Sequence, residues 1–134
     1  MENMKKWESL SKRLISSSKN TLKANKTLRN PDGTHRKKGA QTHAITYEDV
    51  LEILIQQDFK DCYTGLPFEP DYGKKGAALY EAYHPLAPSL DRLDNELGYI
   101  KGNIQLTFRF INLGFSAYKG DKYHILETLG VRCI

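Results

Sequence analysis

The chain has 134 residues and a net charge of +4, a length that suits one domain with a single hydrophobic core. Its 40% hydrophobic and 27% charged residues are typical of a globular protein and exclude a disordered chain. No apolar run approaches the roughly 20 residues that span a bilayer, and the basic N-terminus lacks the apolar region of a secretory signal. We therefore expect a cytoplasmic protein with no membrane partner.

The positive charge is concentrated at the N-terminus. Residues 1–45 contain 11 Lys and Arg against 3 Asp and Glu, whereas residues 46–134 contain 9 against 13. Basic side chains that neutralise phosphates release counterions and so contribute affinity for nucleic acid. The sequence predicts a basic N-terminal helix, arm and linker over 1–45, attached to a single domain over 46–134. A solubilising basic tail is the alternative.

The first predicted element is an amphipathic helix from Met4 to about Asn20, and the pattern allows an extension through Leu22 and Leu28. Its apolar positions at helical spacing are Trp7, Leu10, Leu14 and Ile15. A turn follows at Asn30–Gly33, and then a basic loop. We expect this loop to be exposed and to contact phosphates through Arg36, Lys37 and Lys38, although a merely solvated loop is an equal alternative.

The second predicted helix is capped by Thr46 and runs to Gln57, with an apolar stripe and acidic residues near its first turn. The segment after it is rich in aromatic, proline and glycine residues, which predicts irregular structure with a short strand around Cys62 and Tyr63. Cys62 and Cys133 are the two cysteines, and without a CxxC pair they exclude a zinc site of four thiolates. We expect both to be free thiols.

The third region predicts a hairpin followed by a helix. A strand over Ser89–Leu93, a loop over 94–102 and a returning strand over Asn103–Leu106 are followed by a helix from Thr107. The apolar positions that would face the hairpin are Phe108, Ile111 and Phe115. A last helix over Lys122–Leu129 completes a small α+β protein.

Polar residues within this hairpin and helix suggest phosphodiester chemistry. Cleavage of a phosphodiester at neutral pH needs a hard cation on the phosphate oxygens and positive charge for the transition state. Magnesium takes oxygen ligands, which Asp91 and Asn112 can supply. Spacing alone does not decide this, because Asp and Asn also occur in turns for local reasons.

The run SLDRLDNELGYIKGNIQLTFRFIN, residues 89–112, resembles the core of HNH endonucleases in their phage-type form, the ββα-metal or His-Me finger group. The preceding CYTGLPF, residues 62–68, resembles the segment before that core, so the likeness covers about residues 46–118. It implies a ββα-metal core and a DNA endonuclease that uses Mg²⁺, Mn²⁺ or another divalent cation, without structural zinc. Asp91 and Asn112 would bind the metal, and Asn103 would hold the base or fix the loop. A phage-encoded protein would act in the cytoplasm of a bacterial host. The sequence leaves the target site and the oligomeric state open.

The departure from that family is Arg92, which stands where a histidine acts as general base. Arginine stays protonated and cannot accept the proton. One alternative gives Arg92 a phosphate-binding catalytic role and the base role to His84, with Tyr83 or Tyr99 behind it. In a second alternative a metal-activated water needs no side-chain base. In the third the protein is a non-catalytic nucleic-acid-binding module. Lys101 and Arg109 are candidate phosphate contacts, or else solvated surface charges.

Overall fold

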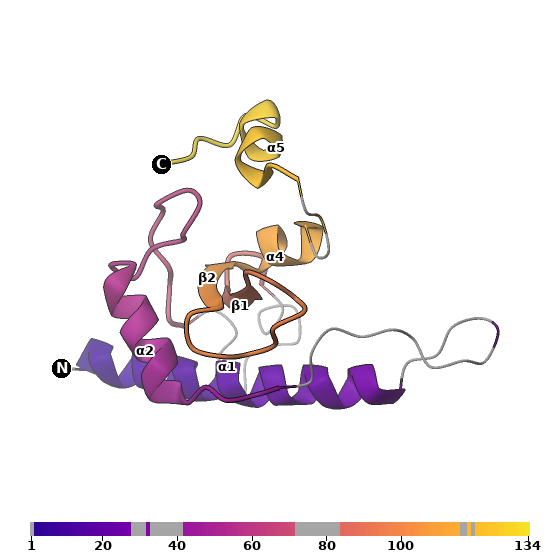
Figure 1. The fold of residues 1–134 in the computed structure, drawn as a ribbon. Coiled ribbons are helices and arrows are strands. Elements are labelled where there is room, and N and C mark those ends of the chain that lie inside the picture. Colours follow the sequence, from indigo (N-terminus) through magenta and orange to yellow (C-terminus); the bar gives the residue numbers. More distant parts are fainter. Residues whose placement is uncertain (1, 28–31, 33–41, 72–83, 116–117, 119) are drawn as a thin grey trace.

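The computed structural model describes residues 2–27, 32, 42–71, 84–115, 118 and 120–134. These residues form the helices α1 (Glu2–Thr27), α2 (Tyr47–Gln56), α4 (Arg109–Phe115) and α5 (Lys122–Thr128), and the strands β1 (Pro88–Arg92) and β2 (Ile104–Phe108). Mixed helix and strand content confirms the α+β prediction. The hairpin of β1 and β2 lies between the long α1 on one side and α4 on the other, with α5 beyond α4 (Figure 1).

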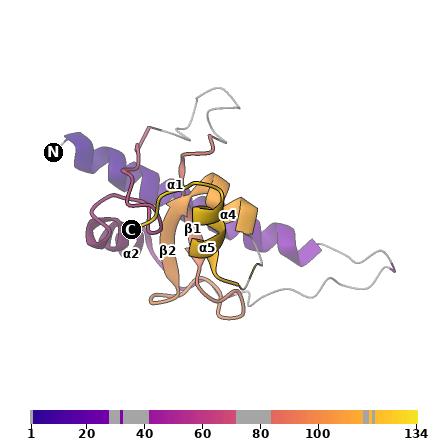
Figure 2. The ribbon, with the colours of Figure 1, turned by 90° about the horizontal axis from the view of Figure 1, so that it is seen from above.

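Helix α1 is part of the hydrophobic core. Seen from above, it passes behind the hairpin and beside α2 (Figure 2), and it includes the predicted extension through Leu22. Trp7, Leu10 and Leu22 are buried in the same apolar cluster as residues of α2 and the hairpin. The change of charge balance at residue 45 therefore does not mark a change of packing among the described residues. No helix in the described part of the chain is long and apolar enough to cross a membrane.

Helix α2 begins as its sequence predicts. The Thr46 hydroxyl accepts a hydrogen bond from the Asp49 backbone N–H at 3.4 Å, and the Asp49 carboxylate accepts one from the Thr46 N–H at 3.0 Å. This capping box satisfies two donors that a helix start leaves unpaired. Val50 and Leu54 are fully buried against the rest of the core. The helix holds one side of the domain through these two residues.

The hairpin differs slightly from its predicted limits. Strand β1 begins and ends one residue earlier than predicted, and β2 begins one residue later and continues through Phe108. Leu90 pairs with Leu106 and Asp91 with Gln105. The predicted helix start at Thr107 is wrong. The Asp61 carboxylate accepts hydrogen bonds from the Thr107 hydroxyl and the Phe108 backbone N–H, at 2.5 and 3.1 Å, which hold both residues in the strand.

The predicted strand around Cys62 and Tyr63 is also wrong, because these residues lie in a turn. The second oxygen of the Asp61 carboxylate accepts hydrogen bonds from the backbone N–H groups of Tyr63 and Thr64, at 3.3 and 2.8 Å, and this curls the chain. Cys62 and Cys133 are free, as predicted. Burial raises the pKa of Cys62 to about 12, so its thiol stays protonated at neutral pH.

Candidate functional site

A groove of about 600 Å³ follows the outer edge of β1. All residues of β1, Pro88–Arg92, line it, and no residue of β2 does. Because successive side chains of a strand point to opposite faces of the sheet, a groove bordered by one face would meet only alternate residues. The groove therefore crosses the unpaired edge of β1 and reaches both faces of the hairpin.

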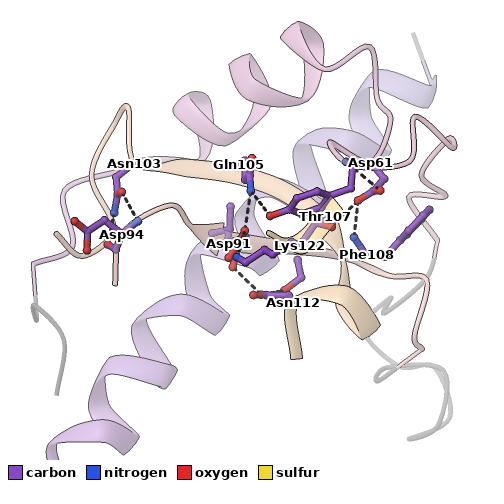
Figure 3. A network of polar contacts seen from close by, with 12 residues as sticks. Asp61, Asp91, Asp94, Asn103, Gln105, Thr107, Phe108, Asn112 and Lys122 are labelled. Atoms are coloured by element: carbon purple, nitrogen blue, oxygen red, sulfur yellow. Dashed lines mark hydrogen bonds and ion pairs between the residues drawn. The ribbon is translucent and has the colours of Figure 1, made fainter. Parts of the chain in front are cut away.

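Asp91 lies at this edge and is 6% exposed. Its Oδ2 accepts a hydrogen bond from Gln105 Nε2 at 2.8 Å, and Lys122 Nζ of α5 lies 4.0 Å from the same oxygen (Figure 3). Within the described residues, Asp91 Oδ1 accepts no hydrogen bond. A buried polar atom is seldom left without a partner. This oxygen is therefore suited to a cation or an ordered water molecule.

Asn112 reaches the same groove from α4. The backbone N–H groups of Arg109 and Phe110, in the first turn of α4, donate to carbonyl oxygens just before β1, and these bonds hold the helix against the strand. Asn112 Nδ2 then donates to Ser89 Oγ at 2.7 Å and to the Leu90 carbonyl oxygen at 3.0 Å. Because a carbonyl oxygen can only accept, the amide nitrogen must face it. The Asn112 Oδ1 is the atom left for another partner.

Together, Asp91 Oδ1 and Asn112 Oδ1 are a carboxylate and an amide oxygen, which are ligands that Mg²⁺ and Mn²⁺ prefer. Among the described residues there is no group of three or more His, Cys, Asp or Glu that could hold a metal ion. A cation between these two oxygens would therefore keep several water molecules, as Mg²⁺ commonly does in proteins. These two oxygens can hold a cation that keeps most of its water ligands, but they are too few to hold a cation by protein ligands alone.

Arg92 lies on the opposite face of β1 from Asp91 and also lines the groove. Its guanidinium carbon is 4.8 Å from the centre of the Tyr99 ring, a cation–π contact that fixes the side chain. Tyr99 is 6% exposed, and its burial raises the pKa of the phenol, opposed in part by the Arg92 charge. The phenol is therefore neutral at neutral pH, where it is a poor general base.

Asn103 organises the loop that carries Tyr99. Its Oδ1 accepts a hydrogen bond from the Asp94 N–H at 2.9 Å, and its Nδ2 donates to the carbonyl oxygens of Asp94 and Gly98 at 2.9 and 2.7 Å. Gly98 has a φ of 76°, and a Cβ there would lie 2.6 Å from the Thr42 carbonyl oxygen. Only glycine allows this close approach, which docks the loop beside residues 42–45.

His84 lies in the turn before β1 and is not among the residues that line the groove. Its Nδ1 accepts a hydrogen bond from the Leu86 backbone N–H at 3.1 Å, so the ring is held by its own turn. Tyr83, which the sequence offers as an alternative base, lies outside the described residues.

The predicted phosphate contacts fall into three groups. Arg109 lines the groove beside Asn112. Lys101 is instead drawn to α2, where its Nζ lies 3.2 Å from the Glu52 carboxylate and 4.0 Å from that of Asp49. Arg36, Lys37 and Lys38 lie outside the described residues.

Three features of the site were missed by sequence reasoning. Gln105 donates a hydrogen bond to Asp91 and another to the Tyr63 hydroxyl, the latter at 3.0 Å. The contact between Gln105 and Asp91 could be predicted only once the register of the hairpin is known, because these two residues are paired across it. Lys122 comes from a distant helix and leaves no local signal. The groove wall that α1 provides could have been recognised from polar side chains at helical spacing near Ser17.

No family model, no curated protein and no solved structure matches the chain. The functional interpretation therefore depends on the residues of the groove and on the sequence resemblance described above.

Proposed function

We propose that this protein is an endonuclease of the HNH, or ββα-metal, type that hydrolyses phosphodiester bonds in DNA with a bound divalent cation. One observation carries most of the weight. The Asp91 carboxylate, whose Oδ1 accepts no hydrogen bond within the described residues, and the Asn112 amide lie in one groove with the positive charges of Arg92 and Arg109. The order of β1, β2 and α4 is also the order that the resemblance implies.

Each residue has a separate role in this proposal. Asp91 and Asn112 would hold the cation, and Gln105 would orient Asp91 through its hydrogen bond. A bound Mg²⁺ or Mn²⁺ would supply positive charge to the phosphate oxygens. Arg92 and Arg109 would attract the phosphate and stabilise the negative charge that develops during cleavage.

The proposed reaction also needs a proton acceptor. An arginine side chain cannot act as the proton acceptor, so Arg92 does not take this role. His84 is the side chain that we propose for it, although its ring is held in the turn before β1. Replacing His84 with glutamine tests the assignment. Unchanged cleavage at every pH would exclude a base role for His84.

A cleavage assay with plasmid and oligonucleotide DNA tests the nuclease activity. We expect cleavage with Mg²⁺ or Mn²⁺, none with EDTA, and a fall to the EDTA level in Asp91→Asn and Asn112→Ala. Asp94→Asn is the matched control, because Asp94 is an exposed acid of the same hairpin that lies outside the groove. Its side chain accepts a hydrogen bond from the Glu96 N–H at 2.9 Å, which asparagine can also accept. Equal activity in all of these proteins would refute the proposal.

A second candidate function is a nucleic-acid-binding protein that keeps this fold without turnover. The specific observation in its favour is Arg92, which replaces the expected base and is fixed against Tyr99. This candidate predicts binding that needs no metal, no cleavage under any metal condition, and weaker binding in Arg92→Ala. Metal-dependent cleavage that disappears in Asp91→Asn would exclude it.

A further inference from the structure

Helix α1 forms the second wall of the groove, opposite α4. Its contribution comes from Leu14, Ser17, Ser18, Asn20 and Thr21. Leu14, Ser17, Ser18 and Thr21 follow the spacing of one helix face. The proposed chemistry uses β1 and α4 and assigns no role to this wall.

The α1 wall is polar but uncharged, whereas the two arginines of the groove belong to other elements, Arg92 to β1 and Arg109 to α4. Ser17, Asn20 and Thr21 are exposed and present hydroxyl and amide groups to the groove. Hydroxyl and amide groups hydrogen-bond base edges as well as sugar and phosphate oxygens, whereas arginine adds a positive charge for the phosphate. The groove thus offers positive charge for phosphate from β1 and α4, and hydroxyl and amide groups for the sugar and base of the same strand from α1.

The dimensions of the groove limit what can enter it. A volume of about 600 Å³ lies within the range of sites that hold one small molecule. Asp91 is 6% exposed and lies at the edge of β1 between two helices. An intact duplex is a stiff cylinder with two backbones, whereas a single strand has only one. The volume of the groove therefore favours a single backbone over a duplex.

We propose that the groove takes one unpaired strand of nucleic acid, with α1 contacting its sugars and bases while Arg92 and Arg109 contact its phosphates. This inference names the substrate class of the proposed nuclease site and rests on that proposed function for its catalytic meaning. The preferred substrates are single strands and locally opened junctions. Intact duplex is a poor substrate.

Two adjacent serines give a matched test. Ser17 lines the groove and Ser16 does not, and both are exposed on α1. We expect Ser17→Trp to weaken binding of a fluorescent single-stranded oligonucleotide by about tenfold or more, and Ser16→Trp to leave it unchanged. Binding is measured by fluorescence anisotropy in EDTA, so that no cleavage occurs, and circular dichroism checks that both variants keep their helix content.

A second variant covers the case in which the tryptophan disturbs the fold. Asn20→Ala removes a wall amide without adding volume, and we expect it to weaken binding of the single strand more than it weakens binding of the annealed duplex. Equal losses for both forms would overturn the inference.

The comparison of substrates separates this inference from the nuclease proposal. We expect the wild-type protein to bind the single strand more tightly than the same sequence annealed to its complement, and to cleave fork or bubble DNA at the unpaired part. Equal binding of single strand and duplex, with Ser17→Trp and Ser16→Trp alike, would overturn the inference even if Asp91-dependent cleavage is found. A second outcome is also informative. If Ser17→Trp alone loses single-strand binding while the wild-type protein cleaves no DNA, the groove binds a single strand but the nuclease proposal is refuted.

Discussion

Replacing Asn103 with alanine tests the most connected polar side chain of the hairpin loop. Asn103 is 4% exposed, and within the described residues its side chain makes three hydrogen bonds, to the Asp94 N–H and to the carbonyl oxygens of Asp94 and Gly98. Each such bond contributes on the order of 1 kcal/mol, and a buried group left unpaired costs about 1–3 kcal/mol. Asp94 is exposed and can bond water after the change, whereas Gly98 is buried.

These contributions predict a loss of about 2–4 kcal/mol in the free energy of unfolding. For a chain of this size the loss corresponds to a fall in Tm of roughly 10 °C. Urea and thermal unfolding followed by far-UV circular dichroism measure both quantities. Asn95→Ala is the control, because Asn95 is on the same loop, is partly exposed and makes no side-chain hydrogen bond within the described residues; we expect a change of less than about 0.5 kcal/mol.

The variant Asn103→Asp separates hydrogen bonding from side-chain volume. Aspartate has nearly the same shape, but it would place a carboxylate oxygen against two carbonyl oxygens that now accept hydrogen bonds. We expect it to be at least as destabilising as alanine. If Asn103→Ala costs less than about 1 kcal/mol, or if Asn103→Asp is as stable as the wild type, the loop does not depend on these bonds and the reasoning fails.

Three further predictions concern other polar contacts. Asp61→Asn should lower the free energy of unfolding by about 3 kcal/mol or more in urea, because the carboxylate is 1% exposed and both of its oxygens accept hydrogen bonds; a loss below about 1 kcal/mol would contradict this. Lys122→Met should raise the affinity for Mn²⁺ measured by calorimetry, because it removes a cation 4.0 Å from Asp91; weaker Mn²⁺ binding would instead show that the lysine supports the site. Burial, with a smaller effect of a nearby lysine, lowers the pKa of His43. The unfolded chain therefore binds the proton more readily than the folded one, and the free energy of unfolding decreases as the pH falls below about 6.5. His43→Gln should lose less stability than the wild type between about pH 7 and pH 5, and identical pH profiles would rule the histidine out as the cause.

The fold could be predicted where short segments determine their own structure. The Thr46 cap and its apolar stripe define α2, and the glycines of residues 94–102 mark the loop between the strands. The two wrong predictions, a strand around Cys62 and a helix start at Thr107, have the same cause. Asp61 bends residues 62–64 into a turn and keeps Thr107 and Phe108 extended, and no local pattern shows that one carboxylate does both.

The candidate site divides in the same way. Asp91, Asn112, Arg92 and Arg109 could be identified from the sequence, and they line one groove. Lys101 could not be placed, because its partners are carboxylates of α2 and depend on how that helix packs. The same holds for Lys122, whose position beside Asp91 depends on the docking of α5.

The adjacency of Asp91 and Arg92 has a structural meaning that the sequence alone leaves hidden. Neighbouring residues of a strand point to opposite faces, so a site on one face of the hairpin could use only one of them. A site in the groove can use both residues, because the groove follows the edge of β1 and is lined by Asp91 and Arg92. A strand of nucleic acid lying across that edge would find the carboxylate and the Asn112 amide on one side and the guanidinium, stacked on Tyr99, on the other. In that arrangement Arg92 does not replace a missing base at the same point in space. It would contact a different part of the substrate, so Arg92→His should not by itself place a proton acceptor beside Asp91.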